Sequence, residues 1–227
     1  MLYIVSTPIG NLDDVSQRTI STLKKVDLIL AEDTRRIKKL MNRYDIKNEI
    51  TSYHEHTSPK KEEKIISLLK EGKEISLVSD SGTPLISDPG YKLVKKAVHE
   101  GIKISPIPGP SAILSALVSS GCTTDKFMFL GFVPKKQGER KKFFEKIKNT
   151  DMTTIIYESP YRITKTLEVM KDILPGRDIC ICREITKKFE EFIYGNSKEI
   201  LDKMSKKVKG EITIVIDKQI SPRWIYY

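Results

Sequence analysis

The chain of 227 residues is 39% hydrophobic and carries 40 Lys and Arg against 30 Asp and Glu, a formal net charge of +10. A chain of this length buries roughly 70 to 75% of its unfolded surface, and the apolar content excludes a disordered polycation. Three cysteines without a C-x-x-C pair exclude a disulfide framework and a standard zinc site, so we expect reduced thiols in a cytoplasmic protein. We expect no secretory leader and no membrane association, because no apolar run approaches the ~18 residues of a membrane span.

The first half of the chain alternates short β-branched runs with segments of helical period, which is typical of parallel βαβ units. The strands are predicted at residues 2–6, 26–31, 49–53, 75–79 and 103–107. Apolar stripes predict helices between them, at Ile37, Leu40, Met41 and Tyr44, at Ile65, Leu68 and Leu69, and at Tyr91, Val94 and Val98. A last helix over 111–120 stops at Gly121, where we place the end of an N-terminal domain, residues 1–121.

The second half of the chain does not keep the alternation of strands and helices, because two strand-like runs at 178–184 and 189–194 are separated by only a few residues. So short a connection requires antiparallel pairing. Further strands are predicted at 127–133, 153–157 and 211–216, with helices near 138–149, 161–173 and 196–207. The sequence therefore predicts an α/β fold of two domains, a mostly parallel sheet in residues 1–121 and a mixed sheet in 122–220, followed by a short aromatic tail, 221–227.

Small and acidic residues follow four of the five strands predicted in the first domain, at 6–11, 32–35, 79–84 and 108–111. The carboxyl ends of parallel strands share one edge of the sheet, where such folds bind their ligands. For any single loop, Gly, Pro, Ser and Asp are simply what a turn requires, but their joint placement indicates one crevice. Neither a G-x-G-x-x-G nor a Walker sequence occurs, which argues against a standard dinucleotide or nucleoside triphosphate site.

Five motifs carry a resemblance to a known family: STPIGNL at 6–12, AEDTR at 31–35, SDSGTPLISDPG at 79–90, IPGPSA at 107–112 and ESPYR at 158–162. Together they resemble the tetrapyrrole methylase-like superfamily and, within it, the ribosomal RNA small subunit methyltransferase I family. The resemblance implies an enzyme that uses S-adenosylmethionine, bound in a cleft between the two domains, to methylate the ribose 2′-hydroxyl of a cytidine in the decoding region of 16S rRNA. It also implies the 30S ribosomal subunit as a partner and, usually, a homodimer.

Cofactor contacts are carried over from the resemblance onto matching positions, where turn geometry is the alternative explanation. They are Pro8, Ile9, Asp80, Gly82, Thr83, Ser111, Ala112, Leu130 and Gly131. Methyl transfer needs no metal, and we expect none. The loop His54-Glu55-His56 is interpreted as a polar turn rather than a metal site, because a third convincing donor is missing.

A 2′-hydroxyl must lose its proton during or after attack, which requires a carboxylate, Lys or His within hydrogen-bond reach. The candidates are Glu32, Glu158 and Glu184, because each ends a predicted strand. Each of these carboxylates could instead have a structural role, in which it caps a helix or pairs with a neighbouring Arg.

A basic run follows the predicted strand 127–133, with six cations among residues 135–146. With the net charge of +10, it favours a surface that tracks RNA phosphates, although lysine runs more often form a solvated face. The RNA-binding candidates are Arg35, Arg36, Lys135, Lys136, Arg140, Lys141, Lys142 and Arg162.

Two alternative functions stay open at this point. A precorrin-type tetrapyrrole methyltransferase would use the same cleft but would need no basic surface. A non-catalytic RNA-binding assembly factor would keep the fold and the charge but would bind no S-adenosylmethionine.

Overall fold

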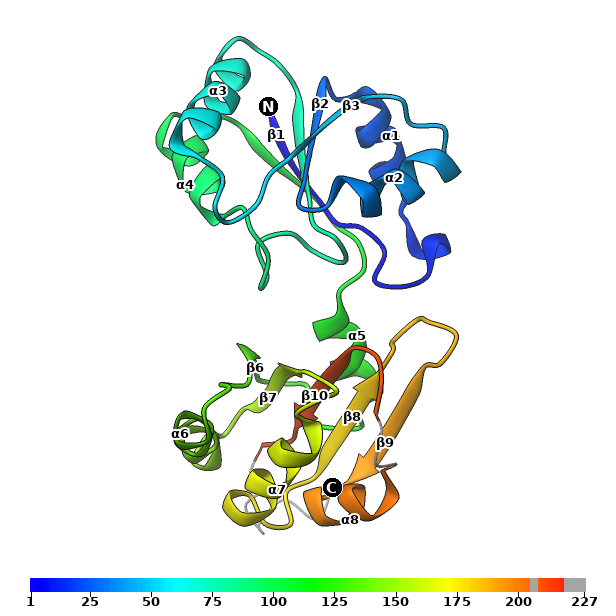
Figure 1. Ribbon diagram of the computed structural model, residues 1–227, viewed down its shortest axis with the longest axis vertical. Helices are drawn as coiled ribbons and strands as arrows, with labels where there is room; N and C mark the ends of the chain where they lie inside the picture. The colour runs from blue at the N-terminus through cyan, green and yellow to red at the C-terminus, as the bar shows by residue number, and fades with distance from the viewer. Residues whose placement is uncertain (205–207, 219–227) are drawn as a thin grey trace. The chain divides into compact units, whose positions relative to one another are not determined.

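The computed structural model describes residues 1–204 and 208–218 (Figure 1). Contacts divide the chain into two compact units, Met1–Ser111 and the part from Ala112 onward. The limit expected at residue 121 lies at the other end of one helix from this division and stays a prediction about domain boundaries. The expected tail 221–227, and residues 205–207 of the helix expected at 196–207, lie outside the described residues.

The first unit is built on a parallel sheet of five strands, in the order β3-β2-β4-β1-β5. Every neighbouring pair runs parallel and in register, so all five carboxyl ends share one edge. Central strands of such sheets are covered on both faces, and β4 accordingly has no exposed residue. The strands are β1 (Leu2–Val5), β2 (Leu28–Ala31), β3 (Glu49–Ser52), β4 (Ile75–Val78) and β5 (Ile104–Ile107), which confirms the parallel sheet expected from the sequence.

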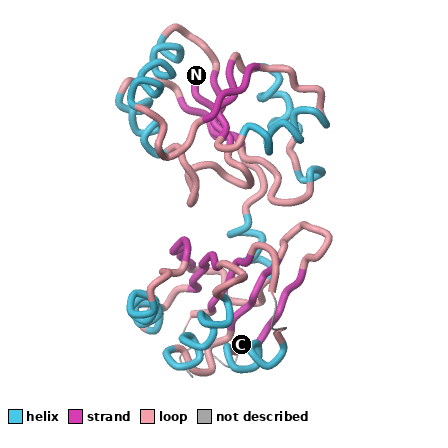
Figure 2. The backbone as a smooth tube through the Cα atoms, viewed as in Figure 1, coloured by secondary structure: helices cyan, strands magenta, loops and turns pink. Residues whose placement is uncertain are grey.

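Two pairs of helices cover the two faces of this sheet (Figures 1 and 2). One face packs against α1 (Gln17–Lys25) and α2 (Thr34–Arg43). A short 3-10 helix, Leu12–Asp14, precedes α1 in the chain. The other face packs against α3 (Pro59–Lys70) and α4 (Tyr91–His99). Each pair forms its own apolar core with the strands beneath it.

The predicted stripe of α4 was wrong for two of its three residues, Tyr91 and Val98, whereas Val94 packs against the core. Tyr91 and Val98 are each 64% exposed, whereas Leu93 and Ala97 are fully buried. Two overlapping stripes with helical spacing exist in this segment, and packing against the sheet buries the one that contains Leu93 and Ala97.

The second unit contains a mixed sheet in the order β6-β7-β10-β8-β9. Its strands β6 (Phe127–Phe132) and β7 (Thr153–Glu158) run parallel, while β8 (Ile179–Arg183), β9 (Glu191–Gly195) and β10 (Ile212–Ile216) pair antiparallel. Both the mixed sheet and the antiparallel β8–β9 pair were expected from the sequence and are confirmed.

One face of the second sheet is covered by α6 (Gln137–Lys148), α7 (Ile163–Ile173) and α8 (Ser197–Lys203), which share a core with it. On the opposite face, α5 (Ala112–Ser119) packs against β10. Cys180 and Cys182 lie on this face, buried and with their sulfurs 3.6 Å apart, as expected for alternate residues of one strand. None of the helices within the described ranges is long and apolar enough to span a lipid bilayer.

Candidate functional site

The loops after β1 and β4 are joined by backbone hydrogen bonds at the carboxyl edge of the parallel sheet. Thr7 N donates to Gly82 O at 2.9 Å, and Gly82 N donates back to Thr7 O at 3.0 Å. Ser79 Oγ also donates to the Gly82 carbonyl at 3.2 Å. The Ser6 and Thr83 hydroxyls are 3.1 Å apart, so side chains join the two loops as well. Two of the predicted cofactor contacts, Gly82 and Thr83, therefore lie directly beside the first loop.

The loop after β5 packs against the same pair of loops through its glycine. A Cβ on Gly109 would lie 2.9 Å from Ser6 Cβ, closer than real contacts allow. Gly82 has a φ of +78° and faces Ile9, whose Cγ2 would be 3.3 Å from an added Cβ, while Pro110 O would be 3.7 Å away. Three loops thus meet with little space between them, and the predicted contacts Pro8, Ile9 and Ser111 lie in these loops or at their ends.

A carboxylate connects the β4 loop to the start of α2. Asp80 accepts a hydrogen bond from the backbone N–H of Asp33 at 2.9 Å and pairs with Arg36 Nε at 3.3 Å. Asp33 caps α2 and accepts two bonds from the Arg35 guanidinium, at 3.0 and 2.8 Å, which lower the pKa of Asp33 to about 2. Two of the four predicted RNA-binding arginines, Arg35 and Arg36, therefore pair with carboxylates, yet the Arg35 side chain is 88% exposed.

Two other carboxyls at this edge are harder to ionise than usual. Partial burial, followed by the negative charge of Asp80, raises the pKa of Glu32, and Arg36 opposes this only in part. Burial and the charges of Glu32 and Asp80 raise the pKa of Asp88 to about 6. Because perturbed carboxyls concentrate at functional sites, Glu32 and Asp88 mark this edge as the candidate site.

Asp88 was missed in the sequence reasoning, although it belongs to the quoted motif SDSGTPLISDPG. The loop reaches back to the strand ends through two residues in the left-handed region, Leu85 with φ of 72° and Ser87 with φ of 64°. Strained non-glycine residues of this kind cluster at functional sites. The signal in the sequence was the Asp-Pro-Gly turn at the end of this motif, but the return of Asp88 to the strand ends depends on this backbone.

The other two predicted bases, in the second unit, are engaged in local hydrogen bonds. Glu158 is 2% exposed and accepts from Ser159 N at 2.6 Å, from Thr166 Oγ1 and from Arg162 Nη2 at 2.7 Å. Arg162 Nη1 also donates to Val133 O at 3.0 Å. This network ties the ends of β6 and β7 to the start of α7, and Glu158 has the alternative role of pairing with a neighbouring Arg.

Glu184 also holds backbone in place. Its carboxylate accepts from Lys187 Nζ at 2.9 Å and from Glu211 N at 2.8 Å, and its side chain fills the space above Gly210. Burial opposes its ionisation, but these two donors outweigh burial and lower the pKa of Glu184. Of the three predicted bases, Glu32 alone has a carboxyl with no hydrogen-bond partner among residues 1–204 and 208–218.

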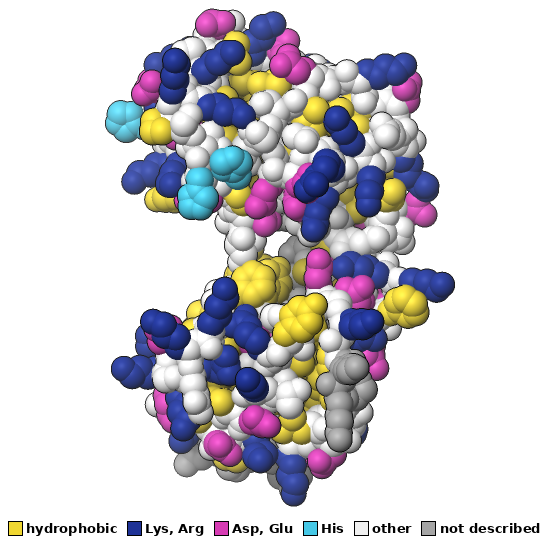
Figure 3. Space-filling model, viewed as in Figure 1, with side chains coloured by type: hydrophobic (Ala, Val, Ile, Leu, Met, Phe, Trp, Pro, Cys, Tyr) yellow, Lys and Arg dark blue, Asp and Glu magenta, His cyan; other side chains and the backbone are white. Residues whose placement is uncertain are grey.

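The basic segment after β6 contains one buried and several exposed cations. Arg140 is 5% exposed, and its guanidinium donates to Pro134 O at 3.3 Å and Lys135 O at 2.9 Å, so it fixes the turn into α6. The exposed cations are the four predicted RNA-binding lysines, Lys135, Lys136, Lys141 and Lys142, together with Lys146. Figure 3 shows Lys and Arg side chains gathered over this part of the second unit, beside exposed hydrophobic ones.

Three predicted cofactor contacts belong to the second unit. Ala112 begins α5 and is half-buried. Leu130 and Gly131 form an irregularity in β6, where the pairing with β7 shifts register.

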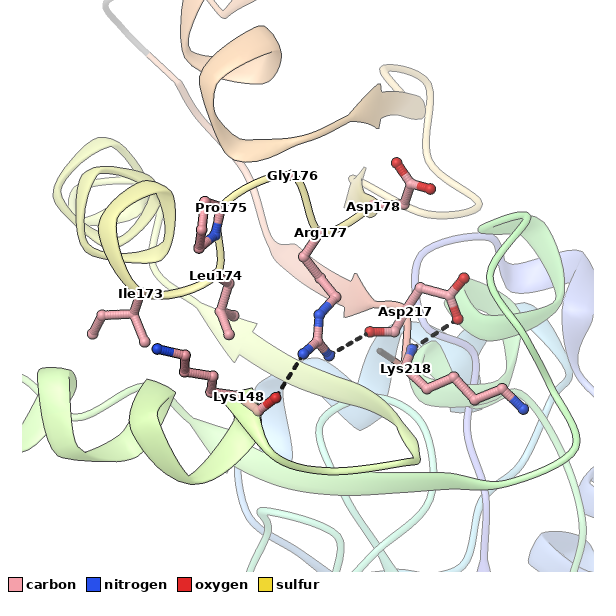
Figure 4. A pocket seen from close by; sticks show the side chains of 9 residues that line it. All are labelled: Lys148, Ile173, Leu174, Pro175, Gly176, Arg177, Asp178, Asp217 and Lys218. Atoms are coloured by element: carbon pink, nitrogen blue, oxygen red, sulfur yellow. Dashed lines mark hydrogen bonds between the residues drawn. The ribbon is translucent and has the colours of Figure 1, made fainter. Parts of the chain in front are cut away.

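A cavity of about 330 Å³ lies elsewhere in the second unit and contains none of the predicted site residues (Figure 4). Its central side chain, Arg177, donates to Asp217 O at 2.9 Å and to Lys148 O at 2.8 Å. Both bonds go to backbone carbonyls, so Arg177 joins chain segments there and the cavity contributes nothing to the candidate site.

Comparisons with known proteins agree with this architecture. Residues 1–201 match the family described as Tetrapyrrole (Corrin/Porphyrin) Methylases. The chain is 45% identical to the ribosomal RNA small subunit methyltransferase I of Halalkalibacterium halodurans, over 100% of this chain and 80% of that protein. It is 46% identical to the protein of the same name from Bacillus subtilis, over 96% and 75% of the two chains. A crystal structure of diphthine synthase matches 97% of this chain and 91% of its own, with a TM-score of 0.73 at 14% identity, which shows a shared fold.

Proposed function

Because the chain belongs to the ribosomal RNA small subunit methyltransferase I family, we propose that it transfers a methyl group from S-adenosylmethionine to the ribose 2′-hydroxyl of a cytidine in the decoding region of 16S rRNA. The match over nearly the whole chain carries this proposal. The small ribosomal subunit as substrate places the enzyme in the cytoplasm, and a homodimer is part of the same proposal.

The residues at the carboxyl edge of the first sheet fit S-adenosylmethionine in their chemistry. This molecule supplies a methyl group activated on a cationic sulfur, together with a ribose whose hydroxyls donate hydrogen bonds. The acidic side chains of Asp80 and Asp88 suit both features, and the absence of side chains at Gly82 and Gly109 lets the three loops that carry the proposed contacts pack together. The Ser6 and Thr83 hydroxyls supply further polar contacts. Pro8, Ile9 and Ser111, and in the second unit Ala112, Leu130 and Gly131, complete the proposed contacts.

We propose Glu32 as the general base that removes the proton of the ribose hydroxyl. A base must be ionised to act, and the best catalytic pKa lies near the working pH. Burial and the neighbouring Asp80 move the pKa of Glu32 upward, toward that range. Its carboxyl has no hydrogen-bond partner within the described part of the chain, whereas Glu158 and Glu184 are held by several donors.

Exposed lysines of α6 and the turn before it supply the proposed RNA phosphate contacts. Lys141 and Lys142 have no ion pair within the described ranges, and Lys136 pairs only with Glu139 three residues ahead, at 3.4 Å. Arg35 remains a phosphate-binding candidate because its side chain is exposed beyond its contact with Asp33. We leave out Arg140 and Arg162, because both are committed to backbone carbonyls.

The test is incubation of the purified protein with methyl-labelled S-adenosylmethionine and either unmodified 30S subunits or naked 16S rRNA, followed by nucleoside mass spectrometry. We expect 2′-O-methylcytidine. Methyl on a base would refute the ribose position. In a parallel incubation with a precorrin as the acceptor, label in the precorrin and none in RNA would support the tetrapyrrole alternative. Absence of S-adenosylmethionine binding in a calorimeter would support the assembly factor.

Glu32→Gln tests the base assignment. We expect the turnover of methyl transfer to fall by about 10²- to 10⁴-fold, while S-adenosylmethionine binding persists. Wild-type turnover falls as pH drops below the raised pKa of Glu32, and this pH dependence disappears in the variant. The matched control is Glu55→Gln, which changes an exposed carboxylate of the loop after β3 that pairs with Lys92 at 2.9 Å. Equal turnover in both variants would refute the assignment.

A further inference from the structure

The edge strand β6 carries exposed aromatic side chains. It lies at one end of the second sheet, paired on one side only, with β7. Phe127 is 42% exposed and Phe132 is 58% exposed. Phe side chains in protein cores, by contrast, bury a large apolar area. Phe129, between them, is half-buried.

A bulge puts these rings on one face of the sheet. Phe129 pairs with Ile155, and Phe132 pairs with Tyr157, so three steps along β6 match two along β7. In a regular strand, residues three apart point to opposite faces. The extra residue falls at Leu130-Gly131, where Gly131 has a φ of +68°, and it returns Phe132 to the face that Phe129 occupies.

The result is a cluster of rings around Tyr157. The ring centroids of Phe129 and Tyr157 are 4.8 Å apart, and those of Phe132 and Tyr157 are 5.4 Å apart. Ile156, on the opposite face of β7, lies in the core under the helices, so the cluster faces away from α6 and α7. On that face α5 packs against β10, in the middle of the sheet. Phe127 and Phe132 are left half-exposed at its edge.

Cations flank the cluster at both ends of β6. Lys126 precedes Phe127, and Lys135 and Lys136 follow the strand by three and four residues; all three are exposed. The backbone that carries the second group is held in place by Arg140, which binds the carbonyls of Pro134 and Lys135. The arrangement is therefore an aromatic surface with lysines at each end. Lys126 pairs with Asp151 at 3.7 Å and Lys136 with Glu139 at 3.4 Å, whereas Lys135 has no ion pair within the described part of the chain.

We propose that the β6 surface, defined as Phe127, Phe129, Phe132 and Tyr157, is a platform on which unpaired bases of the RNA substrate stack. This inference rests on the proposed function in taking RNA as the substrate. Aromatic side chains stack on any base through its π-face, and flanking lysines bind the phosphates between bases. Bases inside a duplex are already stacked and paired, so the surface selects single-stranded RNA.

The test compares Phe132→Ala and Phe127→Ala with a control that removes an exposed Phe at the far side of the same sheet. That control is Phe189→Ala, which changes a residue 64% exposed in the connection between β8 and β9. Binding is measured by fluorescence anisotropy on a labelled single-stranded oligocytidine and on a duplex of the same length. A 2-aminopurine in the oligonucleotide reports stacking directly through the quenching of its fluorescence.

We expect wild type to prefer the single strand, with quenched 2-aminopurine. Each platform variant should weaken single-strand binding by about 5- to 150-fold, because a stacked base contributes ~1–3 kcal/mol. Phe189→Ala should bind as wild type does. Phe132→Trp should keep the quenching while Phe132→Leu loses it, which separates stacking from general apolar contact. Thermal unfolding of each variant checks that the fold is intact.

Unchanged RNA affinity in the platform variants overturns the proposal. So does a loss of S-adenosylmethionine affinity without a loss of RNA affinity, or a change of oligomeric state in the ultracentrifuge, because these outcomes assign the surface to the cofactor or to a second copy. Wild type that binds single-stranded RNA through this surface but transfers no methyl group supports the platform and refutes the proposed function, so the two failures are distinguishable.

Discussion

Asp88→Asn should make the protein more stable at neutral pH and leave it nearly unchanged at acid pH. Folding moves the pKa of this carboxyl from 3.8 to about 6, through burial and then through the charges of Glu32 and Asp80. The native state therefore binds the proton more tightly than the unfolded state does. Ionisation costs stability as the pH rises from about 4 to about 6, and the full cost is present above pH 6.

The magnitude follows from the size of the pKa difference. Two pKa units correspond to about 3 kcal/mol. Asp88 keeps some contact with water, and solvent screening reduces this figure to about 1–2 kcal/mol. Asparagine has a similar shape and cannot ionise, so the variant gains this amount above pH 6. At pH 4 the expected gain is below about 0.5 kcal/mol, because there the wild-type carboxyl is mostly protonated when folded.

Urea unfolding followed by circular dichroism, at pH 4 and at pH 7.5, measures both values. Asp14→Asn is the control, because it removes an exposed carboxylate of the same unit. The gain at pH 7.5 should be present for Asp88→Asn and absent for the control. Equal stability of wild type and Asp88→Asn at pH 7.5, or the same gain at both pH values, would refute the reasoning that burial and the neighbouring carboxyls disfavour the ionised form of Asp88.

Three other variants test the packing and the charge of the two units. Gly109→Ala should destabilise the protein by about 1–3 kcal/mol and weaken S-adenosylmethionine binding, because its Cβ would lie 2.9 Å from Ser6 Cβ; unfolding and calorimetry measure the two effects. Glu158→Ala should cost about 3 kcal/mol of unfolding free energy with cofactor affinity retained, since it breaks a buried ion pair; an unchanged stability would contradict the structural role of that pair. Replacing Lys141 and Lys142 by Gln should lower the salt dependence of RNA binding by about 0.7 for each phosphate that the two lysines neutralise, and an unchanged slope would leave them as a solvated face.

The sequence was sufficient for the architecture because each sheet has a strong local signature. The five β-branched runs of the first unit are spaced by helical segments, and every one became a strand of the parallel sheet. The short link before β9 required the antiparallel pair. The α4 stripe failed because apolar residues on both sides of that helix share helical spacing, and only tertiary packing decides that Leu93 is buried and Val98 is exposed.

The site was predictable only as a set of loops. Position at a strand end was the same clue for Glu32, Glu158 and Glu184, so it could not separate them. Their hydrogen-bond partners do separate them, but these come from other parts of the chain. Glu158 accepts from Thr166, one helical turn into α7, and Glu184 accepts from the backbone N–H of Glu211, which is distant in sequence. The return of Asp88 to the strand ends likewise depends on left-handed backbone in its loop, which apolar periodicity does not encode.

Thr7 and Gly82 share a reciprocal pair of backbone hydrogen bonds, but the two positions differ in which substitutions they accept. Both bonds use main-chain atoms, so other small residues at position 7 can form them. The Thr7 side chain is buried, which excludes large ones, and replacing it loses the weaker hydroxyl contact with Ser79 O at 3.3 Å. Position 82 has no such freedom, because its left-handed backbone and its approach to Ile9 exclude a side chain. Random substitution followed by selection for activity should therefore return several small residue types at position 7 and almost exclusively glycine at position 82, although the two residues share one pair of bonds.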